Sequence, residues 1–214
     1  MDIAPPPEPR HLGKLRQGKV DRILATAEAH FMQFGFSGTT MDTVARDAGV
    51  GKATLYAHFA GKDALFAAAI RQKGERHSTD LLANADATDD LPGVLLRFAH
   101  SFLELLLSPD TIAAHRNVAA EASRAPGLGR LFYESGPARV LDRLALILER
   151  AMRRGLLRQG PPHLAAAQFI GVIRADLQIR AMLGVVATIP AAERQEAVAE
   201  GVAMFLRAYA PSPA

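Results

Sequence analysis

Apolar residues recur along this chain every three or four positions, which is the spacing that places them on one face of an α-helix. The first such stripe runs from Val20 to Phe34, and Gly35 follows it at the position where a glycine commonly ends a helix. Thr39 or Thr40 can cap the next helix, because a threonine hydroxyl accepts a hydrogen bond from a free backbone N–H of the first turn. The pattern therefore predicts a long helix, a short turn and a second helix.

Two short helices come next, with a glycine between them. The first carries a small apolar stripe and ends at Gly49. The second covers about residues 52–59. A further helix begins near Lys62, with Asp63 in its first turn, where a negative charge interacts favourably with the helix dipole.

The remainder of the chain continues the helical spacing, with prolines and glycines at the breaks. Gly136 and Pro137 interrupt one long pattern, so we expect a kink or a break there. The expected helices cover residues 91–107, 111–124, 128–154, 162–183 and 191–209. No stretch alternates between apolar and polar residues with period two, so we predict an all-α fold.

Composition narrows the possible functions. The chain has 214 residues and no cysteine, which excludes disulfides, thiolate zinc sites and cysteine nucleophiles. No apolar run reaches the roughly 20 residues that span a bilayer, and the N-terminus lacks the apolar segment of a signal peptide. We therefore expect a cytoplasmic protein that has no membrane partner.

The net charge of +3 does not by itself indicate nucleic-acid binding. Between residues 10 and 22, however, basic residues gather with a single acid, Asp21, among them. The basic residues are Arg10, Lys14, Arg16, Lys19 and Arg22. A local basic cluster matters more for phosphate contact than the total charge does.

The two short helices around Gly49 have the lengths and the turn of a helix-turn-helix. In such a unit the second helix lies in the DNA major groove and the first crosses the backbone. Gly51 and Ala53 keep the start of the second helix narrow, so its backbone can approach the base edges. Leu55 and Phe59 lie one helical turn apart, and we expect both to face the protein core.

The polar groups at the ends of side chains on the second short helix are suited to contacts with DNA. Thr54 can contact a thymine methyl group or a phosphate, and Tyr56 and His58 are rigid side chains that can donate to phosphates. Lys62 and the free N–H groups at the start of its helix form a further phosphate site. The predicted DNA-binding residues are Lys19, Thr40, Lys52, Ala53, Thr54, Tyr56, His58 and Lys62.

Residues 20–66 resemble the DNA-binding domain of the TetR family of bacterial regulators. The resemblance rests on the segment FGFSGTTMDTVARDAGVGKATLYAHFAGKDALF. Two positions depart from the family pattern, because Gly51 stands where many members have a capping serine and Ala57 where a second aromatic residue is frequent. These departures affect the expected affinity and the number of backbone contacts.

A second resemblance lies further along the chain. The segments HRNVAAEASRAPGLGRLFYESGPARVLDRLALILERAMRRGLL and AAAQFIGVIRADLQIRAMLG are similar to the AefR-like C-terminal domain of one branch of that family. Together the resemblances imply an all-helical homodimer in which a small DNA-binding domain precedes a larger effector-binding domain. Family members mostly repress transcription and release DNA when a small molecule binds, so the resemblance implies a ligand-responsive repressor.

We accordingly expect three parts in the chain. Residues 1–16 are polar and Pro-rich, which is typical of a flexible arm. Residues 17–62 are the expected helix-turn-helix DNA-binding domain, and residues 63–214 the expected effector-binding and dimerisation domain.

The expected helix 162–183 carries two apolar faces. One face holds Ala166, Ile170, Ile173, Leu177 and Ala181, and the other holds Phe169, Val172, Ile179 and Leu183. A helix that is apolar on two sides is buried on two sides. One side can serve its own domain while the other, with helix 191–209, meets a partner chain, or both sides are intramolecular core. Asp176 lies within the second face, where it can pair with Arg180 or be a polar group in a ligand cavity or dimer interface.

The predicted effector-binding residues are His100, Leu103, Leu107, Asn117, Glu121, Tyr133, Ile173, Asp176 and Leu177. His100 equally suits a satisfied core histidine, Asn117 and Glu121 a solvated surface, and Tyr133 the hydrophobic core. A pocket among these side chains would be apolar and aromatic with few polar anchors, which favours a small hydrophobic effector.

Other chemistry has little support in the sequence. The histidines show no paired ligand spacing, and neither a phosphate-binding loop nor a nucleophile elbow is present, so we predict no metal, no cofactor and no enzyme activity. Two further functions remain open. The protein can be a transcriptional activator or a constitutive DNA-binding protein without an effector, or a helical enzyme or carrier in which the first domain would have no purpose.

Overall fold

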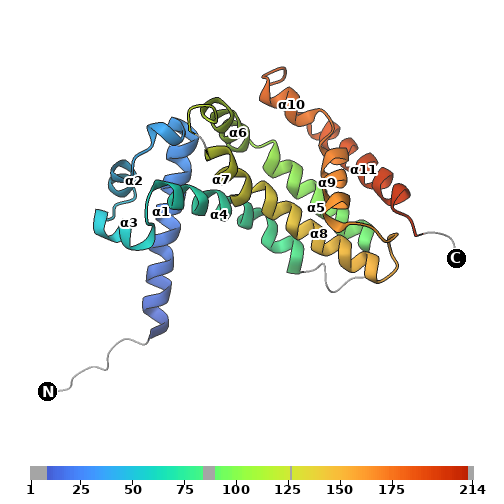
Figure 1. The fold of residues 1–214 in the computed structure, drawn as a ribbon, viewed down its shortest axis with the longest axis horizontal. Coiled ribbons are helices and arrows are strands. Elements are labelled where there is room, and N and C mark those ends of the chain that lie inside the picture. Colours follow the sequence, from blue (N-terminus) through green and yellow to red (C-terminus); the bar gives the residue numbers. More distant parts are fainter. Residues whose placement is uncertain (1–8, 84–89, 126, 212–214) are drawn as a thin grey trace. The chain divides into compact units, whose positions relative to one another are not determined.

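The computed structural model describes residues 9–83, 90–125 and 127–211, and all regular secondary structure in these ranges is α-helical (Figure 1). The helices are α1 Pro9–Gly38, α2 Met41–Asp47, α3 Lys52–His58, α4 Lys62–Ala83, α5 Leu91–Leu106, α6 Pro109–Glu121, α7 Leu128–Ser135, α8 Pro137–Arg153, α9 Pro162–Arg174, α10 Leu177–Met182 and α11 Ala191–Ala208. The predicted all-α fold is confirmed. The chain divides into two compact units, residues 1–72 and 73–214, so the division lies inside α4 rather than at the 62/63 boundary expected from the sequence.

The first unit packs α1 against α2, and α2 against α3. The helix was predicted to end at Gly35; the helical conformation does stop there, with φ 70° and ψ 179°, a conformation open to glycine and strained for other residues, but α1 resumes after it and runs to Gly38. The buried Thr39 hydroxyl donates to the Gly35 carbonyl oxygen at 2.8 Å and fixes the chain after the interruption. The core of this unit includes Ile23, Leu24, Ala27, Phe31, Val44, Ala45, Ala48, Leu55, Leu65 and Phe66.

The predicted flexible arm lies only in part within the described residues. Residues 9–16 belong to the first turns of α1, where the sequence had predicted the end of the arm. Residues 1–8 lie outside the described ranges.

The second unit is built around α5, α8, α9 and α11. Figure 1 shows α8 beside α9, and α11 packs against both α9 and α5. Its core includes Leu95, Phe98, Leu103, Leu144, Leu148, Phe169, Ile173, Val198, Val202 and Phe205. Gly201 permits the close approach of α11 to α9, because a Cβ atom there would lie 3.1 Å from the Ile173 Cα atom.

The prediction of one continuous helix over residues 162–183 is wrong. The helix breaks after Arg174, where Ala175 has φ 44° and ψ −131°. The short α10 that follows is held from α6, because the Arg116 guanidinium donates to Ala181 O at 2.7 Å and to Met182 O at 2.8 Å. Because these hydrogen bonds come from a distant part of the chain, the sequence pattern around residue 175 does not indicate the break.

The break also changes the second apolar face predicted for this helix. Phe169 is fully buried and Val172 is half-buried. Ile179 and Leu183, which follow the break, are 51% and 72% exposed. The second face is therefore buried or half-buried in α9 and exposed in α10, and its contact with a partner chain stays a prediction.

Among the described residues, no single helix is long and apolar enough to cross a membrane. Only α5 and α6 taken together meet the length and composition required, and they are bent by 61° at the break between them.

Candidate DNA-binding surface and effector domain

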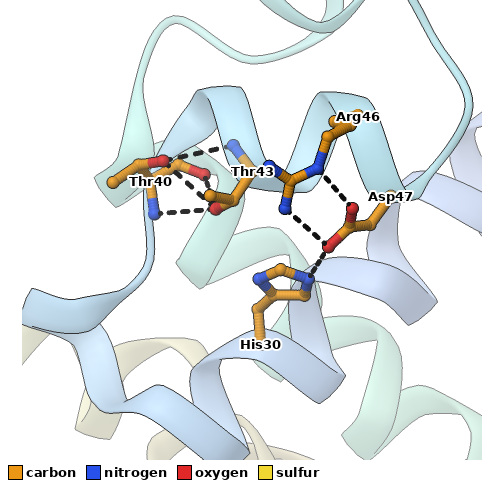
Figure 2. A network of polar contacts seen from close by, with 5 residues as sticks. All are labelled: His30, Thr40, Thr43, Arg46 and Asp47. Atoms are coloured by element: carbon orange, nitrogen blue, oxygen red, sulfur yellow. Dashed lines mark hydrogen bonds and ion pairs between the residues drawn. The ribbon is translucent and has the colours of Figure 1, made fainter.

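The start of α2 is closed by two threonines (Figure 2). Thr40 is the N-cap, and its hydroxyl accepts a hydrogen bond from the Thr43 N–H at 3.1 Å. The Thr40 N–H donates to the Thr43 hydroxyl at 3.3 Å, and that hydroxyl donates to Thr40 O at 2.9 Å. This capping box satisfies free N–H groups of the first turn and confirms Thr40 as the cap. The Thr40 hydroxyl proton can then point to Thr43 Oγ1 or to a DNA phosphate.

The far end of α2 is tied to α1 by a second polar network (Figure 2). Asp47 Oδ2 lies 2.9 Å from His30 Nε2, and Asp47 Oδ1 lies 2.8 Å from Arg46 Nε. The hydrogen bond from Arg46 lowers the pKa of Asp47, with a smaller contribution from His30, and the same hydrogen bond raises the pKa of Arg46. Because α2 is held at both ends, it provides a fixed support for the helix that follows it.

The chain turns from α2 to α3 at Gly49, which has φ 63° and therefore suits glycine. Leu55 is fully buried and Phe59 is 8% exposed, so the prediction that both face the core is confirmed. The opposite side of α3 faces outward. Its exposed residues are Lys52, Ala53, Tyr56, Ala57 and His58, and Thr54 is half-buried.

Lys62 joins the start of α4 to the end of α1. Its ammonium group donates to Phe36 O at 2.9 Å and lies 4.5 Å from the centre of the Phe36 ring. An ammonium group has three N–H donors, so this hydrogen bond leaves donors that can reach a phosphate. Lys62 therefore has a structural role that the sequence did not indicate, beside its predicted contact with DNA.

An ion pair bridges the starts of α2 and α3. Lys52 Nζ donates to Asp42 Oδ2 at 2.6 Å, and this hydrogen bond raises the pKa of Lys52. Lys19, the remaining predicted DNA contact, is exposed on α1. Asp42 was not among the residues predicted from the sequence, because its pairing with Lys52 depends on how two helices cross.

Both parts of the chain match a known family. Residues 23–69 match the family described as bacterial regulatory proteins, tetR family, and residues 93–211, more than half of the chain, match the AefR-like transcriptional repressor, C-terminal domain. The chain belongs to the TetR family. It is therefore a DNA-binding transcriptional regulator and not an enzyme; membership of the family implies operator DNA binding, dimerisation and effector binding.

Individual relatives support this membership. The flavonoid-responsive regulator FrrA is 36% identical, with a TM-score of 0.72 over 92% of this chain and 100% of FrrA. A TetR-family transcriptional regulator from Mesorhizobium loti MAFF303099 is 28% identical, with a TM-score of 0.76 over 91% of this chain and 98% of that protein. The HTH-type transcriptional regulator YhgD of Bacillus subtilis strain 168 is 52% identical over 44 residues, which is 21% of this chain and 23% of YhgD. The chain thus spans about a quarter of the length of the curated relatives that it matches.

The predicted effector residues of this TetR-family chain fall into three groups by exposure. Leu103, Ile173 and Leu177 are buried, Leu107, Asn117 and Glu121 are half-buried, and His100, Tyr133 and Asp176 are exposed. The structure brings Leu103, Ile173 and Leu177 into one hydrophobic core, and Leu107 packs against it. Burial alone does not test a role in effector binding, which stays a prediction for all of them.

Two alternatives for these residues are wrong. His100 is not a core histidine, because it is exposed on α5 beside the buried stripe that includes Phe98 and Ala99. Tyr133 is not a core aromatic, because its side chain is 51% exposed. It belongs to a helix of only eight residues, α7, whose packing against α6 and α8 leaves another side outward.

The pairing of Asp176 with Arg180 is confirmed, with Asp176 Oδ1 at 3.5 Å from Arg180 Nη1. The same guanidinium lies 2.5 Å from Glu193 Oε1 at the start of α11, and this hydrogen bond raises the pKa of Arg180. Arg180 therefore links α10 to α11.

His115 is a further candidate effector contact that was not predicted from the sequence. Its Nδ1 lies 2.7 Å from Thr111 O, and its half-buried ring stands edge-on to Phe132 with centroids 5.0 Å apart. A polar ring between α6 and α7 is the kind of anchor that an apolar pocket uses. The only indication in the sequence was that His115 lies four residues after Thr111 and so shares a helix face with it. Within the described ranges, no group of three or more potential ligands could hold a metal ion.

Proposed function

We propose that this chain is a ligand-responsive repressor that leaves its operator when a small hydrophobic molecule binds. The observation that carries the proposal is the match to FrrA, a flavonoid-responsive regulator, over the whole length of that protein. The C-terminal family is described as that of a transcriptional repressor, which favours repression over activation. A transcriptional activator, or a constitutive DNA-binding protein without an effector, is the alternative.

The outward side of α3 would enter the major groove of operator DNA. Ala53 is small enough to let the helix approach the base edges, and Thr54 can contact a base or a phosphate. Tyr56 is 51% exposed although large and aromatic, which suits a side chain whose hydroxyl meets DNA. His58, Lys52, Lys62, Lys19 and Thr40 would contact phosphates around it.

A homodimer would place two copies of α3 on successive half-sites. The chain offers a surface for such a dimer on α9 and α11, where Leu164 and Met204 are 52% and 51% exposed. Small residues on the same helices, Ala167 and Gly171 of α9 and Ala199 of α11, are also exposed and allow a partner helix to approach closely. Half-sites one helical turn apart have centres about 34 Å from each other.

We propose that the second unit, residues 73–214, binds the effector among the predicted residues of α5, α6 and α7, with His115 as an additional polar contact. The aromatic and aliphatic side chains of these helices suit a planar aromatic compound such as a flavonoid. Ligand binding would release DNA by favouring a dimer whose two α3 helices no longer match successive grooves. Because its proposed partner is operator DNA, we propose that the protein acts in the cytoplasm.

A gel shift on the DNA upstream of the protein's own gene tests this function. Purified protein should shift that DNA at nanomolar concentration, and the affinity should fall as salt rises, because lysines release condensed counterions from phosphates. Addition of flavonoids, with polar sugars as a control, should then dissociate the complex. A complex that forms with the same affinity on unrelated DNA, or that no hydrophobic compound dissociates, would contradict the proposal.

A further inference from the structure

Asp42 is an acidic residue on a surface that has to meet a polyanion. It lies in the first turn of α2, beside the N-cap Thr40, and its carboxylate reaches Lys52, the first residue of α3. The Asp42 Oδ2 to Lys52 Nζ distance is 2.6 Å. The pair thus connects the two helix starts that a helix-turn-helix directs toward DNA.

Asp42 in the first turn of α2 interacts favourably with the helix dipole, but that interaction does not need Lys52, so it does not explain the pair. Both side chains are well exposed, 58% for Asp42 and 66% for Lys52, and exposed ion pairs contribute little to the folded state. The start of α2 is already capped by Thr40 and Thr43, so the Asp42 side chain is not required as a cap. The position of the pair therefore points to a role in DNA binding.

The pair has opposite consequences for two kinds of DNA. Lys52 can neutralise a phosphate fully only if it leaves Asp42, to which its charge is paired. On DNA without an operator, where binding rests almost entirely on phosphates, this cost weakens the complex. On the operator, base contacts from the rest of α3 supply affinity, so Lys52 can stay with Asp42, and a lysine already held in place loses less conformational freedom on binding.

We propose that Asp42 is a positioning residue that holds Lys52 for the operator and selects against DNA that offers only phosphates. The inference rests on the proposed placement of α3 in the operator. It adds a residue that determines the ratio of specific to non-specific affinity and acts through Lys52. Selectivity of this kind comes from a penalty on the wrong partner as well as from contacts to the right one.

Asp42→Asn in the full-length protein tests the proposal by fluorescence anisotropy on operator and on scrambled DNA across a salt series. We expect tighter binding to scrambled DNA and a ratio of operator to scrambled affinity about two- to fivefold lower, the size of an exposed ion-pair coupling. The plot of log affinity against log salt on scrambled DNA should steepen by about 0.9, because one more phosphate is neutralised. An unchanged ratio and slope would overturn the proposal.

Two further variants separate positioning from a general charge effect. In a Lys52→Met background, Asp42→Asn should have no effect on the ratio, and an effect that persists there would show that Asp42 acts through space and overturn the positioning role. Glu104→Gln removes one exposed carboxylate from α5 in the other unit and should leave both ratio and slope unchanged. Wild-type protein that shows no preference for the operator would instead refute the proposed function, and the inference with it.

Discussion

The Lys62 ammonium group donates to the Phe36 carbonyl oxygen at 2.9 Å and lies 4.5 Å from the centre of the Phe36 ring. Phe36 follows the interruption of α1 at Gly35, and its ring stands edge-on to Phe66 of α4. The lysine thus joins the start of α4 to the end of α1 by a hydrogen bond and a cation–π contact. The DNA-binding unit therefore relies on Lys62 for its own structure as well as for any contact with phosphate.

Lys62→Met should lower the free energy of unfolding of this unit by about 1–2 kcal/mol, since it removes a hydrogen bond from a charged donor and a cation–π contact. Urea unfolding followed by circular dichroism measures the loss. Lys19→Met, which removes an exposed lysine from α1, is the matched control and should leave the transition in place. Equal transitions for Lys62→Met and wild type would contradict the structural role.

Thr40→Ala should cost about 1 kcal/mol of stability, because it removes the hydroxyl that caps α2. Thr40→Ser keeps the hydroxyl and should retain most of the stability. Thermal unfolding of both variants measures the difference. The role of Thr40 as a cap fails if the alanine and serine variants unfold at the same temperature.

Ala175 has φ 44°, a backbone conformation that residues other than glycine rarely adopt. Ala175→Gly should therefore stabilise the second unit by about 1 kcal/mol. Glycine relieves the backbone strain in the folded state, and this gain exceeds the cost of the greater conformational entropy of the unfolded chain. Ala119→Gly, at an exposed position of α6, should instead destabilise by up to about 1 kcal/mol. Urea midpoints of the two variants should shift in opposite directions, and a loss of stability in Ala175→Gly would contradict the break between α9 and α10.

The lowered pKa of Asp47 implies that the stability of the first unit depends on pH. Its pKa is lowered in the folded protein by the hydrogen bond from Arg46, so its contribution to stability is present above the unfolded pKa of about 3.9 and is lost as pH falls through the folded pKa. Asp47→Asn should therefore differ most from wild type above about pH 5 and converge with it toward pH 3. Urea midpoints measured from pH 3 to pH 7 test this, and a difference that stays constant with pH would count against the network.

The parts of the structure that local patterns determine were predictable from the sequence. Gly35 and the threonine cap at residue 40 predict the turn before α2. The spacing of Leu55 and Phe59 alone predicts which side of α3 faces the core. The break at Ala175 was not predictable, because the bonds that hold α10 come from Arg116, far away in the sequence. The same holds for the pairing of Asp42 with Lys52, which depends on the crossing of two helices.

The effector residues were less predictable than the DNA-binding surface. A groove-facing helix must be exposed on one side, so its contacts follow from helix spacing. A ligand contact inside a helical domain has the same apolar spacing as the core, and His100 and Tyr133 show that spacing does not reveal the exposed side of a helix.

Selection of DNA from a pool of random duplexes tests the central claim, that the outward side of α3 recognises a specific operator. Wild-type protein should enrich inverted half-sites about one helical turn apart. Tyr56→Ala should lose this enrichment, whereas Tyr133→Ala, which removes an equally exposed tyrosine from the second unit, should keep it, since both side chains are 51% exposed. Random sequences recovered with wild-type protein, or the same half-sites enriched equally by Tyr56→Ala, would show that α3 does not recognise a specific operator.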